Sequence, residues 1–545
     1  MSIIAILATE ERVNGIIMNT RVMHTFRQLT PLSRYLVEAI EEKPDAKHEE
    51  RRITVNPIVS KFASWYERLR NAMEFREDEV ILRATIERIL KRRLLLGGTG
   101  KTTAKPLVKE LLWARYLPDG DVGESIAHQI EEVIDLYLEL RLRVLQKHKI
   151  SESELNEWTY DLMSADIQYI LNPKRPKELI ANFMFHVLKD DVEIEGVNEQ
   201  TKDAQVFIGV RKSFARDDLA FLRYHLFCQF FGKLTRETID ATAEHFLKGF
   251  QEIHRQMTYK GRERIYNYVK RRTAAFFIFD DIMQSKKHNI KTILENEEEL
   301  HKVVLDACEK RYKGINTRVR TAIIRSVIFL IFTKVGFAFF VEGTYERIFL
   351  GAIHWESIII NTTIPPLLMI IVSFFIRTPG KENSETVFTY ITRLLYDEDP
   401  VLGNKLLITK QKVDKGFLTA FNILWLIAFG ISFGGIIFVL VKLQFNIVSM
   451  GIFVFFLAIV SFLAYRISLL ANVYRVGEKQ GLGTLVVDFL FMPVIRVGRS
   501  LTQGISQINI FLMLFDFFIE APFKFLFAFF DQWFYFLHSK TEELE

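Results

Sequence analysis

The chain has 545 residues, of which 71 are Lys or Arg and 66 are Asp or Glu, giving a formal net charge of +5. The charges are unevenly divided, because residues 1–320 hold 53 basic and 49 acidic side chains, whereas residues 321–545 hold 18 and 17. The second part also contains 32 of the 48 phenylalanines. This division excludes a wholly soluble or a disordered protein, and the small basic excess predicts no nucleic-acid partner.

Helical periodicity dominates residues 1–320, where apolar side chains recur three and four positions apart, as in Ile130, Val133 and Ile134. We therefore expect a mostly α fold with an all-helical cytosolic N-terminal half. A polar connection near 189–205 suggests two cytosolic helical subdomains, 1–190 and 191–320, the second being juxtamembrane. A short strand at 192–194, pairing with 206–210, is the one non-helical element expected there.

One segment of this half resembles a nucleotide-binding phosphate loop, because Gly100, Lys101 and Thr102 match the end of that motif. The match is incomplete: Leu95 stands where the first glycine belongs, and the preceding residues read as a helix rather than a strand. We expect a Gly-rich turn between two helices and keep a nucleotide site as the alternative. The sequence supports no other cofactor, no metal site and no nucleophile–base pair, so it leans against an enzyme.

Residues 321–470 are expected to form four transmembrane helices in two hairpins, because four stretches approach the roughly 20 apolar residues that cross a bilayer. These stretches are 323–341, 358–376, 417–441 and 443–465. Lys and Arg are concentrated before the first, between the second and third, and after the fourth. The positive-inside rule therefore predicts a multi-pass protein of the cell (inner) membrane with both termini in the cytosol.

The first two spans contain polar residues whose role the sequence leaves open. Lys334 is the only charge deep in a span, and its flexible stem is expected to reach the outer interface. The alternative is an intramembrane polar site that Lys334 forms with Asn361, Pro365 and Pro366 of the second span.

Gly430 and Gly434 form a small-xxx-small face on the third span, which lets two helix backbones approach closely. We expect this face to pack on the fourth span near Gly451 or Ala458. The alternative is a contact between two copies of the chain, which would make the protein a homo-oligomer.

Two segments next to the spans are expected to meet lipid. Anionic headgroups attract basic side chains near the membrane surface, and the cluster preceding the first span comprises Lys310, Arg311, Lys313, Arg318 and Arg320. Residues 471–545 should form an amphipathic membrane-surface segment, since the polar residues of 505–536 share one narrow helical stripe. The rival interpretation is a further span at 505–527.

The large helical domain, the short outer loops and the absence of a supported active site together predict a non-enzymatic, multi-pass membrane protein. Its cytosolic half would be a scaffold that binds an unidentified cytosolic protein partner. Two alternatives stay open: a small oligomeric channel or transporter subunit with Lys334 near its pathway, and a membrane ATPase that uses Lys101.

Overall fold

The computed structural model describes eleven main stretches of the chain together with residue 489 and a few single positions between 526 and 537. The stretches are 28–41, 52–74, 78–95, 97–172, 175–286, 289–351, 355–400, 404–409, 415–443, 445–476 and 491–501. The predicted interfacial helix at 505–536 therefore lies almost wholly outside the described residues.

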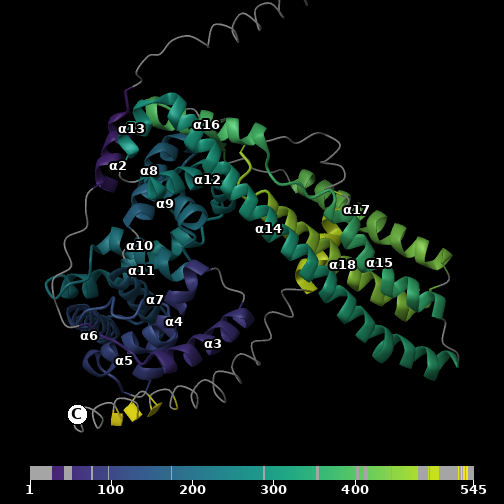
Figure 1. Cartoon of the computed structure of the whole chain (residues 1–545), viewed down its shortest axis with the longest axis horizontal. Helices are drawn as coiled ribbons and strands as arrows, with labels where there is room; N and C mark the ends of the chain where they lie inside the picture. Colours follow the sequence, from purple (N-terminus) through teal and green to yellow (C-terminus); the bar gives the residue numbers. More distant parts are fainter. Residues whose placement is uncertain are drawn as a thin grey trace, which may run out of the picture.

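The fold consists of two helical bundles, one above the other in Figure 1, and a group of long apolar helices that extends away from the upper bundle. Each bundle has its own cluster of buried apolar side chains. A third cluster lies among the apolar helices. The three clusters define the units described below.

The lower bundle, called the first core, encloses the larger apolar cluster of the N-terminal half. Its helices bury side chains three and four positions apart, as Ala243, Phe246 and Phe250 show in α11. The members are α3 (Pro57–Glu74), α4 (Asp78–Leu94), α5 (Gly100–Trp113), α6 (Glu124–Lys147), α7 (Glu152–Leu171), α10 (Leu219–Phe231) and α11 (Ile239–Met257).

The upper bundle, called the second core, combines segments from both halves of the sequence. Its helices are α2 (Pro31–Glu41), α8 (Arg175–Leu188), α9 (Glu199–Val210), α12 (Arg262–Ser285), α13 (Ile290–Glu295), the first half of α14 (Glu297–Phe337), and α16 (Lys381–Tyr396). Helix α16 comes from the connection between the second and third predicted spans, and it buries Val387, Ile391 and Leu395 here. The sequence analysis did not anticipate this helix.

The division between the cores differs from the predicted boundary near residue 190. Helices α10 and α11 return to the first core, whereas α2 and α8 belong to the second. The expected strand exists as β1 (Val192–Ile194), but it pairs in parallel with β2 (Leu406–Ile408). The predicted partner, 206–210, was wrong, because this apolar run lies in α9, and a short apolar run fits a helix as well as a strand.

Three helical stretches of the described residues are long and apolar enough to cross a membrane: Glu297–Phe349, Thr419–Lys442 and Ile447–Ala471. A shorter apolar helix, Ile358–Ser373, corresponds to the second expected span. In the structure these segments are α14 with two π-helical turns, Ala338–Gly343 and Glu346–Leu350, then α15 (Trp355–Ser373), α17 (Lys415–Lys442) and α18 (Ile447–Ala471).

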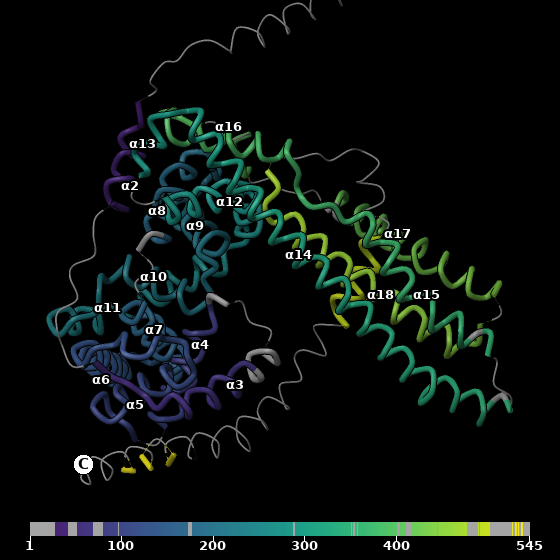
Figure 2. The backbone as a smooth tube through the Cα atoms, in the orientation of Figure 1, coloured from purple at the N-terminus to yellow at the C-terminus, as the bar shows by residue number. Residues whose placement is uncertain are grey.

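Helix α14 belongs to two units at once. It is a single α-helix of 41 residues, about 60 Å long at 1.5 Å per residue, and Figure 2 shows it running from the upper bundle along the apolar helices. Near its start, Leu300 and Val304 are buried in the second core. Farther along, Val319 and Leu330 are buried in the third cluster with residues of α18.

Candidate functional site

From Leu330 onward, α14 and the two π-helical turns that follow it bury every fourth residue, and three of these residues are charged. The buried positions are Leu330, Lys334, Ala338, Glu342 and Glu346. In a regular α-helix, side chains four positions apart drift by about 40° per step, which would carry this stripe around the helix. The π-helical turns at Ala338–Gly343 and Glu346–Leu350 place more residues in each turn, so the stripe stays on one side.

Two charged residues of this stripe, Lys334 and Glu342, form a buried triad with Asn361 of α15. The Lys334 ammonium donates to Asn361 Oδ1 at 2.8 Å and lies 3.2 Å from Glu342 Oε1. Asn361 Nδ2 in turn donates to Glu342 Oε1 at 2.7 Å. All three side chains are at most 1% exposed. Because its partners lie inside the protein, Lys334 does not extend to the outer interface, and that expectation was wrong.

A separate polar contact connects the last charged residue of the stripe, Glu346, to the start of α18. Asn446 caps this helix by accepting a hydrogen bond from the Ser449 amide at 2.8 Å. Its Nδ2 donates to Glu346 Oε1 at 2.9 Å, and Glu346 is fully buried. The Glu346 carboxylate therefore lies near the amino end of a helix, where the helix dipole favours negative charge. Through Glu342 and Glu346, the π-helical turns that follow α14 are bonded to α15 and to the residue that caps α18.

The two prolines lie in the uninterrupted helix α15, one turn beyond Asn361. Because proline has no N–H, Pro365 and Pro366 cannot donate to the carbonyls of Asn361 and Thr362 four residues earlier. The buried Thr362 hydroxyl likewise has no hydrogen-bond partner among the described residues. These polar groups lie next to an open groove of about 520 Å³, whose lining includes Thr362, Phe339, Arg347 and Trp355.

The triad is chemically incomplete on one side, because Glu342 Oε2 is buried and has no hydrogen-bond partner among the described residues. Removing an ion pair from water is expensive unless every lone pair finds a partner. The sequence analysis identified Lys334 and Asn361 but assigned Glu342 and Glu346 to an outer loop. Their spacing of eight and twelve residues from Lys334 was the signal that could have found them.

The phosphate-loop segment forms a turn between two helices. Gly97 has a φ of +80°, and the amides of Gly97 and Gly98 donate to the carbonyls of Leu94 and Arg93, which closes the end of α4. At the start of α5, the amide of Gly100 donates to Asp135 Oδ1 at 2.8 Å. A carboxylate thus occupies the helix terminus where a phosphate would bind.

Two residues of the same segment, Lys101 and Thr102, contribute nothing to a closed binding site. Both are exposed, and Thr102 takes part in a local capping box with Thr99. A helix rather than a strand precedes the turn. The geometry therefore provides no support for a nucleotide site at Gly100, Lys101 and Thr102.

The basic cluster before the first span is used partly inside the protein. Lys310 and Lys313 pair with acidic residues four positions earlier on α14. The Arg311 guanidinium binds Asp281 of α12 and the Tyr474 hydroxyl beyond α18, the latter at 2.6 Å. Of the five predicted residues, Arg318 and Arg320 are exposed, and contact with headgroups remains a prediction for them.

The predicted glycine contact between α17 and α18 is absent from the described residues. A Cβ added to Gly430, Gly434 or Gly451 would meet no atom within 4 Å. Instead, a Cβ on Gly498 would lie 2.0 Å from the carbonyl oxygen of Ala458. The helix around Gly498 therefore occupies the surface of α18 that we had assigned to α17.

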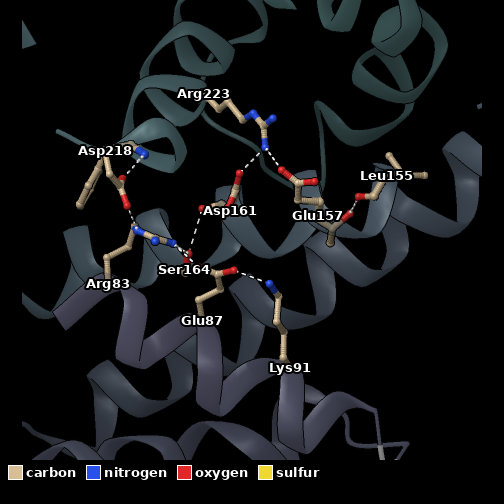
Figure 3. A network of polar contacts seen from close by, with 11 residues as sticks. Arg83, Glu87, Lys91, Leu155, Glu157, Asp161, Ser164, Asp218 and Arg223 are labelled. Carbon is tan, nitrogen blue, oxygen red and sulfur yellow. Dashed lines mark hydrogen bonds and ion pairs between the residues drawn. The ribbon is translucent and has the colours of Figure 1, made fainter. Parts of the chain in front are cut away.

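A second buried polar network ties α4, α7 and α10 together in the first core (Figure 3). Arg83 of α4 binds Asp218 at 2.6 Å and donates to the Ser164 hydroxyl at 3.1 Å. Arg223 of α10 binds Asp161 of α7 at 2.5 Å. Despite that arginine, burial raises the pKa of Asp161 to about 6. This network fixes the packing of three helices.

No group of three or more His, Cys, Asp or Glu side chains in the described part of the chain is arranged to hold a metal ion. No protein-family model, curated protein or solved structure matches the chain. The triad therefore has to be interpreted from its own geometry.

We predict that Lys334→Met lowers the free energy of unfolding by about 3–5 kcal/mol, because it leaves the buried Glu342 carboxylate without its cation. The double variant Lys334→Met/Glu342→Gln should recover much of this loss, since it removes both charges. Arg325→Met is the matched control, because Arg325 is exposed on the same helix. The measurement is reversible unfolding of the purified chain in detergent micelles. Equal stability of Lys334→Met and Arg325→Met would contradict a paired, buried lysine.

We predict that Asp161 makes the stability of the first core fall as the pH rises. Its pKa is about 6 in the folded chain against a reference of 3.8, so the folded state binds the proton more tightly. The resulting stabilisation, about 2–3 kcal/mol, is complete below pH 3.8 and is lost as the pH rises through 6. The free energy of unfolding, measured against pH, should fall across this window for the native chain, and this fall should be absent in Asp161→Asn. Glu157→Gln, which removes an exposed partner of Arg223, should preserve the pH dependence.

Proposed function

We propose that the chain is a multi-pass membrane protein whose helical N-terminal half is a scaffold for a soluble protein partner. The observation that carries this proposal is the continuity of α14, which is buried first in the second core and then among the apolar helices. A helix without a break transmits its orientation along its length. The scaffold would therefore be held at a fixed angle to the membrane rather than on a flexible tether.

A cluster of hydrogen bonds at the exit from the apolar helices supports this rigid connection. Asn383 of α16 donates to the Tyr312 hydroxyl of α14 at 2.6 Å and to the carbonyl of Tyr474 at 2.8 Å. Its Oδ1 also accepts from the amide of Val476 at 2.8 Å. With the Arg311–Asp281 pair, these bonds join α12, α14, α16 and the segment after α18. We call this cluster the junction.

The cytosolic placement of both termini is part of the same proposal. Lys and Arg flank the apolar helices on the side of the junction, in keeping with the positive-inside rule. The exposed residues Arg318 and Arg320 lie on α14 just beyond the junction. Both are placed to meet anionic headgroups of the inner leaflet.

The scaffold has a groove suited to a peptide segment of a partner. It has a volume of about 640 Å³ and lies between α9, α10 and α11. Its lining combines amide side chains, such as Gln229 and Gln251, with Lys248 and the ring of Phe230. Phe230 is 41% exposed, which provides an apolar anchor beside hydrogen-bonding groups.

We predict that Phe230→Ala removes a partner that co-purifies with the native chain from native membranes. Leu142→Ala is the control, because Leu142 is a comparably exposed apolar residue on α6 of the same core. Quantitative mass spectrometry of the three preparations measures the effect. A protein depleted at least fivefold with Phe230→Ala and retained with Leu142→Ala would support the scaffold. A native chain that purifies alone would contradict it.

The buried triad and its adjacent groove favour a second candidate, a channel or transporter subunit. Ionisable groups among membrane helices are typical of ion and proton pathways. If Lys334 lines such a pathway, the chain reconstituted in liposomes should conduct protons or potassium ions. This flux should be lost with Lys334→Met and kept with Arg325→Met. This candidate would be excluded if dye-filled liposomes that contain the native chain were as impermeable to these ions as liposomes without protein.

A further inference from the structure

Helix α3 has an apolar face that the described part of the protein leaves uncovered. Ile58, Phe62 and Trp65 are spaced by four and three residues and are 50%, 64% and 59% exposed. The opposite face of α3 buries Ala63 and Tyr66 in the first core. The helix therefore needs only one face for packing, and its second apolar face is available for another contact.

The position of α3 indicates what covers this face. Figures 1 and 2 show α3 on the side of the first core that faces the apolar helices. The apolar helices emerge from the upper bundle and extend past this side of the lower one. A bilayer around them would present its inner surface to α3.

The charges of α3 fit an anionic surface. Lys61 and Arg68 are exposed and, at about 100° per residue, both lie along one edge of the apolar face. The nearby acidic residue Glu67 is turned inward, where it binds Arg88 at 3.2 Å and accepts from the Tyr116 hydroxyl. The exposed surface of this part of α3 is thus apolar and basic.

We propose that the face formed by Ile58, Phe62 and Trp65 docks on the anionic lipid surface that the apolar helices enter. Trp and Phe rings insert at the boundary between headgroups and acyl chains, while flanking Lys and Arg meet the phosphates. The inference rests on the proposed function in one respect, that α14, α15, α17 and α18 span a bilayer. It adds a second attachment of the scaffold, independent of α14.

A lipid surface fits this face better than a second copy of the chain. In a symmetric contact through α3, the basic residues Lys61 and Arg68 of one copy would face Lys61 and Arg68 of the other copy. Such an arrangement of like charges is unfavourable. Anionic headgroups meet both the apolar and the basic groups at once.

The test places a nitroxide on Phe62→Cys in the full chain, with Cys228→Ser and Cys308→Ala removing the native thiols. The control label is on Leu142→Cys of α6, an exposed position elsewhere on the first core. Both are measured in nanodiscs of phosphatidylcholine with and without phosphatidylglycerol. With phosphatidylglycerol, the label at position 62 should collide about fivefold less with a water-soluble nickel chelate than the control, and more with oxygen. Adding Lys61→Glu and Arg68→Glu should restore nickel access.

Three results would overturn the proposal. The first is equal nickel access at positions 62 and 142. The second is protection at position 62 that persists in detergent and is abolished by deleting residues 505–545, because the chain's own end would then cover α3. The third is dipolar coupling between labels of two molecules, which would show a second copy. Reporter fusions at Gly343 and Lys381 measure separately whether the chain spans the bilayer. If the two reporters lie on opposite sides of the membrane but the label at position 62 is accessible to nickel, only the α3 docking is refuted. If both reporters lie on the same side, the proposed function is refuted.

Discussion

The structure depends on a helix that stays intact as its surroundings change from a charged helical bundle to a set of apolar helices. Inside hydrocarbon, backbone amides and carbonyls must be paired within the segment, so a helix is the form in which a chain can pass. Helix α14 meets this requirement without a break between the second core and the third cluster. Its orientation then determines where the rest of the second core and the other apolar helices can lie.

The same continuity explains why α14 carries polar contacts at two levels. At the junction, Arg311 and Tyr312 join it to α12, to α16 and to the segment after α18. Farther along, Lys334 and Glu342 bond it to α15. Apolar side chains alone would let neighbouring helices slide or rotate in lipid, since lipid tails provide no hydrophobic drive for their association. Directed hydrogen bonds at both levels fix register and rotation.

Much of the fold could be predicted from periodicity, because helices with one buried face reveal themselves in local sequence. The periodicity predicts helices at 122–148 and 260–285, and the bounds of α6 and α12 lie within two residues of these ranges. The features that were missed depend on distant partners. Strand β1 pairs with β2, more than 200 residues later in the sequence, and α16 is buried by a core formed mainly by the first half of the chain.

The candidate site shows a similar limit of sequence reasoning. Lys334 could be recognised as unusual from its apolar surroundings, and Asn361 from its place beside two prolines. Glu342 was assigned to the loop after the first expected span because the apolar stretch of that span ends at residue 341. The π-helical turn changes this geometry, and the local composition does not predict such a turn.

A π-helical turn makes the backbone less regular than an α-helix. This cost is offset here because the turn brings a carboxylate onto the ammonium of Lys334. The distortion and the ion pair therefore have to be understood together, because the π-helical turn contains the Glu342 carboxylate that meets both the Lys334 ammonium and the Asn361 amide.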